Sequence, residues 1–295
     1  MTLQMTRETT LEAQPYAADE LGGGPSPLET FYDRGDDEVL ADPLLAERHE
    51  ELLCGLERGE LRAARPTPGE GYGWQAERWI KRAILLGFRA FPTLPVEGWG
   101  APAFDRGAYP PRRLALSDGV RLVPGGSAVR RGAYLAPGVV VMPPAYVNVG
   151  AWVGAGTMID SHALVGSCAQ VGSAVHLSAG AQIGGVLEPP GTLPVVVEDG
   201  AFVGGQCGVF EGLVVGREAV LAPGVLLTAS TEIFDTVHDR VWRGQVPPRA
   251  VVVPGSRPAR GDFASDHGLG LYAPIIVKYR DPATDAATAL EGALR

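Results

Sequence analysis

The sequence is short of cysteine and of positive charge, and it contains no long apolar run. Its three cysteines, Cys54, Cys168 and Cys207, lie far apart without metal-ligand spacing, which favours reduced structural thiols over a disulfide framework. The 25 basic residues against 34 acidic ones give a net charge of -9, which argues against a general binder of nucleic acid or anionic membranes. We expect neither a signal peptide nor a membrane span, because no apolar segment has the required length. These shortages predict a cytoplasmic protein that acts on small molecules.

Glycine and proline are abundant, with 40 and 25 residues, which predicts a chain with many turns. The first forty residues combine three glycines at 22–24 with an acidic run at 36–38. This stretch is too polar to form a core of its own, and it predicts a mobile or loosely packed arm.

Two amphipathic helices are predicted after this arm. The first follows Asp42 and Pro43, which suit an N-cap and a first helical position, and it ends before Gly59. The second covers about 75–90, where the charged pair Lys81 and Arg82 lies beside a broad apolar surface. Repeated prolines then break the helical pattern. We assign residues 1–115 to this arm and an α-helical domain.

A period of six residues begins at Val129. An aliphatic residue stands at ten consecutive hexads, and after a jump of eight extra residues the period resumes for seven more. Such a repeat is the strongest fold signal in the chain, because self-similarity indicates a repeat architecture. The aliphatic positions are Val129, Leu135, Val141, Val147, Val153, Ile159, Val165, Val171, Leu177, Ile183, Val197, Val203, Val209, Val215, Leu221, Leu227 and Ile233.

A second inward position follows four residues after each aliphatic one, and it is small almost throughout, with Leu187 and Leu213 as the large exceptions. A large and a small residue in every six suit flat strands joined by tight corners, which predicts a parallel β-helix with three hexads in each triangular coil. We assign residues 116–255 to this domain, with an inserted loop at 189–196 that covers a substrate. Residues 256–295 are expected to form a short C-terminal β-hairpin and helix segment.

Several motifs resemble one family of hexapeptide-repeat enzymes, the tetrahydrodipicolinate N-succinyltransferases. The segments that carry the resemblance are Met158–Asp160, Val165–Gln170, Val175–Ser178, Gly184–Pro189, Trp79–Leu86 and Tyr272–Lys278. The resemblance covers about residues 40 to 280. It implies a left-handed coil, because the hexapeptide family is an exception to the usual right-handed crossover. The expected fold is thus mainly β, a left-handed parallel β-helix with an N-terminal α-helical domain.

The resemblance also implies a reaction. Succinyl passes from succinyl-CoA to the amino group of the ring-opened cyclic dicarboxylate, L-2-amino-6-oxopimelate, in the diaminopimelate route to lysine. The implied assembly is a homotrimer whose sites lie between neighbouring coils. No permanently bound cofactor is implied, since succinyl-CoA is a co-substrate, and no nucleic-acid or membrane partner is expected.

Individual positions carry family roles. Arg121 matches an arginine that holds a substrate carboxylate, and Asp160 matches the aspartate at the acceptor site, while Asn148, Ser167 and Gly185 lie in matching stretches and are assigned to substrate binding. Two positions depart from the family pattern: Gly208 stands where well-known members have a glutamate, and His162 stands where they have tryptophan. Glu211 has a counterpart and becomes a second catalytic candidate.

The chemistry agrees with these residue types. Because an α-amino group has an ordinary pKa of roughly 8, a carboxylate or a water path must accept its proton before it attacks, and Asp160 is the candidate for that role. The alternative for Asp160 is an aspartate that caps its own corner, and for Arg121 and Glu211 it is simple surface exposure. An arginine fork orients a dicarboxylate well. His162 and His176 lack a third partner for zinc, so no metal site is predicted.

The phosphates of CoA need cationic partners. Arg257, Arg260, Lys278 and Arg280 are the candidates, and we expect them to lie together in the C-terminal hairpin, with solvated surface charges as the alternative. Two rival functions stay open. One is an acetyl-CoA-dependent transferase for the same acceptor, and the other is a hexapeptide-repeat scaffold without catalysis, which would need only its repeats.

Overall fold

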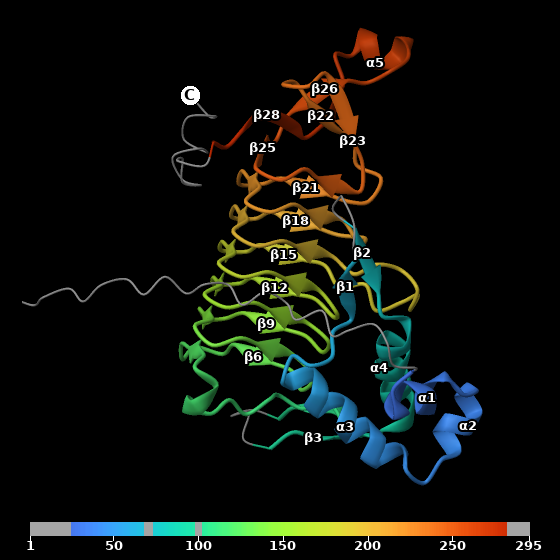
Figure 1. Cartoon of the computed structure of the whole chain (residues 1–295). Helices are drawn as coiled ribbons and strands as arrows, with labels where there is room; N and C mark the ends of the chain where they lie inside the picture. Colours follow the sequence, from blue (N-terminus) through green and yellow to red (C-terminus); the bar gives the residue numbers. More distant parts are fainter. Residues whose placement is uncertain (1–24, 68–72, 98–101, 282–295) are drawn as a thin grey trace, which may run out of the picture.

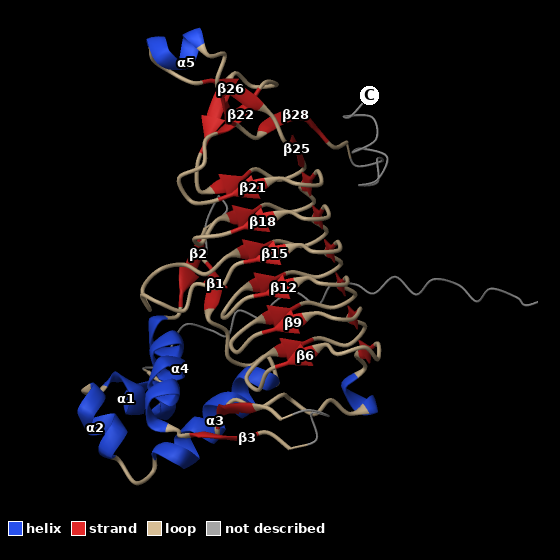
Figure 2. Cartoon of the chain, turned by 180° about the vertical axis from the view of Figure 1, so that it is seen from behind, coloured by secondary structure: helices blue, strands red, loops and turns tan. Residues whose placement is uncertain are grey.

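A three-sided stack of short strands dominates the computed structural model, which describes residues 25–67, 73–97 and 102–281. Helices α1 to α4 lie beside the lower coils of the stack, and a hairpin with helix α5 lies at its upper end (Figure 1). The same stack seen from behind shows the strands one above another with tight corners between them (Figure 2). Within the described ranges, no helix combines the length and the apolar character that a membrane crossing requires.

The stack is a parallel β-helix. Each strand pairs in parallel with the strand one coil further on, as Trp152 does with Gln170 and Met158 with His176. Three sheets form the three faces. The first six-stranded sheet holds β7 (Tyr134–Leu135), β10 (Trp152–Val153), β13 (Gln170–Val171), β16 (Val196–Val197), β19 (Val214–Val215) and β24 (Gln245–Val246). The second holds β6 (Ala128–Val129), β9 (Tyr146–Val147), β12 (Leu164–Val165), β15 (Gln182–Ile183), β18 (Gly208–Val209) and β21 (Leu226–Leu227).

The third face is a ten-stranded sheet. Its parallel part holds β5 (Arg121–Leu122), β8 (Val140–Val141), β11 (Met158–Ile159), β14 (His176–Leu177), β17 (Phe202–Val203), β20 (Val220–Leu221) and β25 (Ala250–Val253). At its upper end β28 (Ile275–Tyr279) pairs antiparallel with β25 and parallel with β22 (Ile233–Asp235), which in turn pairs with β23 (Arg240–Trp242).

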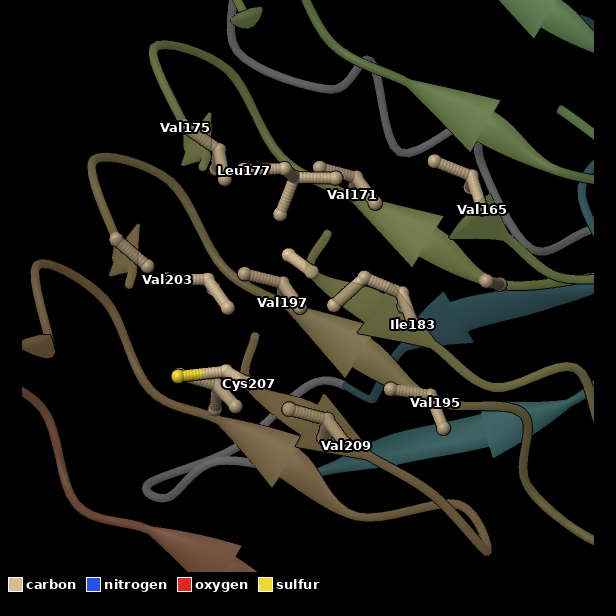
Figure 3. Packing of buried hydrophobic residues seen from close by; sticks show 14 of the residues in the cluster. Val165, Val171, Val175, Leu177, Ile183, Val195, Val197, Val203, Cys207 and Val209 are labelled. Atoms are coloured by element: carbon tan, nitrogen blue, oxygen red, sulfur yellow. The ribbon is translucent and has the colours of Figure 1, made fainter. Parts of the chain in front are cut away.

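The core confirms the period of six. All seventeen aliphatic positions are at most 3% exposed, and they fill the interior of the coil together with the small residues of the second inward position (Figure 3). The glycines predicted at corners, such as Gly150 and Gly212, have φ values of 74° and 73°, a region that costs other residues energy. A regular coil is therefore what this repeat specifies.

Two details of the inserted loop differ from the prediction. Val195 and Val196 already belong to the coil, since both are buried and β16 begins at Val196, so the excursion lies between Ile183 and Val195. The period of six predicts Leu187 in the interior of the coil, but Leu187 packs against the core of the helical domain. The eight extra residues shift the inward position from Leu187 to Val195, because the corner closes only after the loop has returned.

The helical domain contains α1 (Pro27–Asp33), α2 (Asp36–Ala41), α3 (Leu45–Glu57) and α4 (Arg78–Ala90). The predicted arm over the first forty residues is wrong from residue 27 onward, and residues 1–24 lie outside the described ranges. Ser26 caps α1 by accepting a hydrogen bond from the backbone N–H of Glu29 at 3.1 Å, and Pro27 opens the helix. Tyr32 then inserts fully into the helical core.

The two predicted helices are confirmed with shifted starts. The helix α3 begins at Leu45 because Asp42 forms a turn instead, in which its Oδ1 accepts from the N–H of Leu44 at 2.8 Å. The helix α4 begins at Arg78 because 74–76 form a strand. Two hairpins complete the domain, β1 (Ala64–Pro66) with β2 (Trp74–Ala76) and β3 (Thr93–Pro95) with β4 (Phe104–Arg106), and a single 3₁₀ turn, η1 (Leu116–Asp118), precedes the coil.

The hairpin β1–β2 fastens the helical domain to the first six-stranded sheet. The guanidinium of Arg62 lies 3.8 Å above the ring of Trp152, and its Nε donates to Gln170 Oε1 at 3.0 Å. Trp74 Nε1 donates to Glu198 Oε1 at 3.0 Å. These side chains pack on the first six-stranded sheet of the coil.

A buried histidine lies at the centre of the helical core. His49 of α3 is 1% exposed, its Nδ1 lies 3.1 Å from the hydroxyl of Tyr32, and the rings of Phe91 and Tyr109 pack against it. Burial lowers the pKa of His49 from 6.5 to about 4. The imidazole is therefore neutral in the folded protein at neutral pH.

This histidine predicts a loss of stability in mild acid. Because the pKa is lower in the folded state, the unfolded chain binds an additional proton between pH 6.5 and 4, and stability falls as the pH falls through that window. We expect the free energy of unfolding to drop by about 2 kcal/mol between pH 7 and pH 5 through His49 alone. Urea unfolding of the parent and of His49→Gln at both pH values would measure it. Equal drops in the two proteins would contradict the assignment.

The C-terminal segment contains β26 (Ser256–Pro258), α5 (Asp262–Asp266) and β27 (Gly270–Tyr272), and β26 pairs antiparallel with β27. The strand β28 then returns to the coil and joins the ten-stranded sheet. The division of the chain at residue 255 therefore stays a prediction, because β28 shares a sheet with residues on the other side of that boundary.

A buried carboxylate ties β28 to the hairpin β22–β23. Asp235 is 3% exposed and accepts from Tyr279 Oη at 2.7 Å, from Trp242 Nε1 at 3.1 Å and from the backbone N–H of Val237 at 3.0 Å, while His238 Nδ1 lies 3.1 Å away. Burial alone would raise the pKa of Asp235, but the hydrogen bonds outweigh it and hold the pKa at about 2. This network closes the upper end of the coil.

Candidate active site

The candidate residues border one face of the coil, the second six-stranded sheet, which we call the site face. The corners that lead from the ten-stranded sheet into the site face form its leading edge. The corners that lead out toward the first six-stranded sheet form its trailing edge. Asp160 follows β11 on the leading edge, whereas Asn148, Ser167 and Glu211 follow β9, β12 and β18 on the trailing edge. The structure thus places the candidates in two groups with the width of one sheet between them.

Arg121 and Asp160 lie on the same side of the site face, two coils apart, with the coil of β8 between them. Arg121 is exposed on β5, and its Nη2 lies 3.9 Å from Met142 Sδ. Met142 occupies the corner position directly below Asp160, since its N–H donates to the carbonyl of Ile159. Asp160 Oδ1 accepts from the N–H of Ser161 at 2.7 Å. Within the described residues Oδ2 has no hydrogen-bond donor, so one carboxylate oxygen is free to meet a ligand.

His162 lies on the same edge as Asp160. It is exposed, with a φ of 62°, and its carbonyl accepts from Gln182 Nε2 at 3.2 Å. His176 lies instead on β14, where its ring stacks on Phe202 at 5.1 Å between centroids. Among residues 25–67, 73–97 and 102–281, no group of three or more His, Cys, Asp or Glu side chains is arranged to hold a metal ion.

The lower trailing edge is rigid at Asn148. Its Oδ1 accepts from Arg130 Nη1 at 3.3 Å and from the N–H of Val149 at 2.8 Å, and Arg130 is itself paired with Asp105 at 2.5 Å. These contacts fix the amide so that its nitrogen faces away from Arg130. Asn148 can therefore present hydrogen-bond donors to a carboxylate ligand.

Ser167 lies one coil above Asn148, and Gly185 of the following coil is in direct contact with its backbone. A Cβ added to Gly185 would lie 2.3 Å from the backbone nitrogen of Ser167, and one added to Gly166 would lie 2.1 Å from the nitrogen of Gly185. The chain therefore needs glycine at both positions so that the base of the inserted loop can pack flat against the coil below. Gly185 itself is exposed.

Glu211 has an unusual backbone. Its φ is 58°, and Gly212 follows with a φ of 73°, so two left-handed residues stand in succession. The other non-glycine corner residues with positive φ, such as Cys168 and Gln206, occupy the third place after the aliphatic position, whereas Glu211 occupies the second. A left-handed glutamate costs of order 1 kcal/mol or more, and such strain is concentrated at functional sites. The turn projects Glu211 outward, where it is exposed.

Gly208 cannot be replaced by the family's glutamate without a rearrangement. It lies buried on β18, and a Cβ there would lie 2.5 Å from the ring of Phe210 and 3.0 Å from Leu226. The ring of Phe210 thus fills the space that a side chain at 208 would occupy. This leaves Glu211 as the carboxylate of this turn.

A polar cavity of about 420 Å³ lies above Glu211 on the trailing edge. Glu232 pairs there with two cations, Arg243 and Arg257, the latter at 3.8 Å. Tyr272 accepts a hydrogen bond from the N–H of Leu226 at 2.8 Å, which leaves its own hydroxyl proton for another acceptor. Two guanidinium groups against one carboxylate leave a net positive charge. The lining residues are Ser230, Thr231, Glu232, Phe234, Arg243, Arg257 and Tyr272.

The sequence predicts that all four candidate cations for CoA lie in the C-terminal hairpin, and this prediction is wrong for two of them. Arg257 is on β26 and Arg260 lies in the segment between β26 and α5, but Lys278 is on β28 in the ten-stranded sheet. Arg280 follows β28 and donates to the carbonyl of Glu218 at 3.0 Å. Lys278 and Arg280 lie away from the hairpin because the chain returns to the coil after β27, where residues 275–279 form β28 and pair with β25.

Sequence reasoning missed Arg243 and Lys81. Arg243 belongs to the hairpin region after β23, where the period of six is interrupted and gives no prediction of direction. The sequence predicts Lys81 as a polar neighbour of the apolar surface of α4, but the structure shows that it is fully buried. No periodic signal distinguishes a buried lysine from an exposed one, although the position of Lys81 among buried residues of α4 was consistent with burial.

The coil and its edge residues define a hexapeptide-repeat transferase. The family described as "Tetrahydrodipicolinate N-succinyltransferase N-terminal" matches residues 29–90. A 2,3,4,5-tetrahydropyridine-2,6-dicarboxylate N-succinyltransferase of Granulibacter bethesdensis is 47% identical over 252 residues, and one of Methylorubrum extorquens is 43% identical over 255; each alignment covers 83% of this chain and 88% of the relative. The chain belongs to the tetrahydrodipicolinate N-succinyltransferase family.

A solved structure supports the fold. A Campylobacter jejuni protein described as a 2,3,4,5-tetrahydropyridine-2-carboxylate N-succinyltransferase superposes with a TM-score of 0.53 at 18% identity, covering 79% of this chain and 63% of that one. At this level of identity the likeness concerns the fold alone.

Proposed function

We propose that the protein transfers the succinyl group of succinyl-CoA to the amino group of ring-opened tetrahydrodipicolinate, L-2-amino-6-oxopimelate, in diaminopimelate and lysine biosynthesis. The observation that carries the proposal is the placement of the family's residues along one face of the coil. Asp160 and Arg121 border its leading edge, and Ser167, Gly185 and Glu211 border its trailing edge. The relatives described above are named as N-succinyltransferases of 2,3,4,5-tetrahydropyridine-2,6-dicarboxylate, which supports the proposal.

The reaction divides among these residues. The free oxygen of Asp160 accepts a proton from the acceptor ammonium, and the resulting amine attacks the thioester carbonyl. The C–N bond forms, the C–S bond breaks, and the CoA thiolate takes up a proton, which yields the amide and free CoA. Arg121 holds a carboxylate of the acceptor, and Asn148, Ser167 and Gly185 supply polar contacts. Glu211 is a second carboxylate for proton transfer.

The cavity above Glu211 supports an assignment for the CoA phosphates. Arg257 and Arg243 supply the charge, while Ser230, Thr231 and Tyr272 supply hydroxyl donors. Arg260 and Lys278 are further phosphate partners in this proposal. The pantetheine arm of the donor would then run along the trailing edge, where Glu211 lies below the cavity.

Removing either cavity arginine should weaken use of the donor. We expect Arg257→Met and Arg243→Met each to raise KM for succinyl-CoA about tenfold, because a hydrogen bond to a charged group contributes about 1.5–3 kcal/mol, while kcat changes little. Arg240→Met is the matched control, since Arg240 lies over Trp242 and outside the lining of the cavity. Steady-state kinetics with varied succinyl-CoA would measure the three variants. An unchanged KM in both cavity variants would contradict the assignment.

A homotrimer is part of the same proposal, as are a left-handed coil and a cytoplasmic location. The two groups of candidates stand on different edges of one prism, so a neighbouring coil that packs against the site face would supply the missing wall. The site face also exposes Tyr146 and Leu226, which are 37% and 51% accessible. Light scattering at micromolar protein should give three times the mass of the chain, and a monomer mass would refute the trimer.

Thiol release tests the activity. We expect release of CoA from succinyl-CoA only when the acceptor is present, and slower release from acetyl-CoA. Faster turnover of acetyl-CoA would assign the enzyme to the other donor. Absence of acceptor-dependent release from both donors would leave a scaffold without catalysis.

A further inference from the structure

Lys81 is an unusual lysine, because it is fully buried and its hydrogen bonds go to carbonyl groups rather than to a carboxylate. From α4 its Nζ donates to the carbonyls of Pro189, at 3.2 Å, and Thr192, at 2.5 Å. Burial lowers the pKa of its ammonium group. A desolvated lysine of this kind is costly unless its partners are well placed, so the position calls for an explanation beyond surface charge.

The partners of Lys81 belong to the inserted loop between β15 and β16. In that loop the N–H of Thr192 donates to the carbonyl of Pro189 at 3.1 Å, which closes a turn, and Lys81 binds the carbonyl at each end of this turn. Leu187 of the same loop packs into the helical core. Figure 1 shows the loop leaving the stack on the side where α4 and β2 lie. The helical domain therefore holds the loop from behind.

The two ends of the loop meet the trailing edge on successive coils. At its start Gly185 packs against the backbone of Ser167. At its end the carbonyl of Leu193 approaches Gly212 so closely that a Cβ there would lie 2.3 Å away. Gly212 is the second residue of the strained turn that carries Glu211. A movement of the loop would displace Ser167 and Glu211 together.

We infer that Lys81 is a positioning residue, which acts through the inserted loop to hold Ser167, Gly185 and Glu211 in one arrangement on the trailing edge. It contacts no substrate itself. Its ammonium group locks the turn Pro189–Thr192, and the locked loop fixes both ends that abut the site. The inference rests on the proposed function for its effect on turnover, but the bracing of the loop can be measured without any substrate.

Lys81→Met tests the inference, because methionine fills a similar volume without donating a hydrogen bond. We expect kcat/KM for the acceptor to fall about tenfold to a hundredfold, since small displacements of catalytic groups have effects of this size. The dissociation constant for CoA should stay within twofold, because the cation cavity lies elsewhere. Amide hydrogen exchange in the segment 185–195 should become about tenfold faster. Arg89→Met is the matched control on the same helix, as Arg89 is half exposed and pairs with Asp36.

Each result decides the inference. Faster exchange in 185–195 together with the loss of kcat/KM supports it, provided that Arg89→Met stays within twofold of the parent in both measurements. Unchanged exchange, or faster exchange with unchanged turnover, overturns it. If Lys81→Met is insoluble, Lys81→Gln replaces it. Glutamine is a shorter, neutral donor, so we expect a smaller fall in kcat/KM and a smaller increase of exchange in 185–195. Values of both quantities equal to those of the parent would overturn the inference. If the parent protein showed no acceptor-dependent turnover, the proposed function would be refuted instead. The exchange measurement alone would then decide whether Lys81 holds the inserted loop in place.

Discussion

Asp160→Asn should lower kcat by about a hundredfold or more, because it removes the group that accepts the proton of the acceptor amine. The substitution is structurally mild. Asparagine retains an Oδ1 that can accept from the N–H of Ser161, the one hydrogen bond that the Asp160 side chain makes in the described part of the chain. The dissociation constant for CoA should barely change, since the cation cavity is on the other edge of the site face.

Arg121→Lys provides the contrast. A lysine replaces a two-pronged donor by a point charge, so we expect KM for the acceptor to rise more than kcat falls. Arg121 is exposed, and its Nη2 contacts Met142 Sδ at 3.9 Å, so little stability depends on it. Steady-state kinetics of both variants with saturating succinyl-CoA would separate proton transfer from orientation.

Turnover of Asp160→Asn within threefold of the parent, at saturating acceptor, would exclude Asp160 as the base. The proton would then leave by another route, and Glu211 would be the first residue to test. Its strained turn presents an exposed carboxylate on the trailing edge of the site face.

The coil could be predicted from the sequence because its signal is local and repeated. Each hexad places one aliphatic side chain inward, and the register of Val147 with Val165, or Val171 with Val197, follows from the period even across the inserted loop. The prediction failed only where the period is interrupted. Leu187 left the coil interior because the corner that would hold it opens into the loop.

Long-range pairings could not be predicted in this way. The helix α1 was missed because its buried Tyr32 is stabilised by α3 and not by its own polar sequence. Arg243 and Arg257 meet at Glu232 only because two hairpins fold over the end of the coil. Lys81 meets the inserted loop more than a hundred residues further along the chain. The period of six does not predict such contacts between residues that are far apart in the sequence.

The candidate site was partly accessible from sequence for a related reason. Residues one coil apart share an edge, so Asn148 and Ser167 could be placed together by counting, and Asp160 could be placed on a different edge. Counting does not show which edge faces a ligand. The contact of Gly185 with Ser167 and the left-handed turn at Glu211 appear only in the folded chain.

The base of the inserted loop should be sensitive to one added methyl group. Gly185→Ala would place its Cβ 2.3 Å from the backbone nitrogen of Ser167 and 3.0 Å from the Ser167 carbonyl oxygen, and backbone atoms cannot move aside as a flexible side chain can. We expect the loop to lift from the coil, with a loss of about 1–3 kcal/mol in stability and a fall of about a hundredfold in kcat/KM for the acceptor.

Gly191→Ala is the control for this prediction, because it lies in the same loop. A Cβ at Gly191 would meet no atom within 4 Å, so its stability and kinetics should stay within about 0.5 kcal/mol and twofold of the parent. Thermal unfolding and steady-state kinetics with varied acceptor would distinguish the effect of a methyl group at position 185 from the effect of a methyl group elsewhere in the loop. If both alanines behaved alike, close packing of the loop against Ser167 would not be what holds this part of the trailing edge, and Lys81 could not act on Ser167 through Gly185. If only Gly185→Ala lost stability and turnover, the size of the fall in kcat/KM relative to the loss of stability would show how strongly the arrangement of the active site depends on the contact of Gly185 with Ser167.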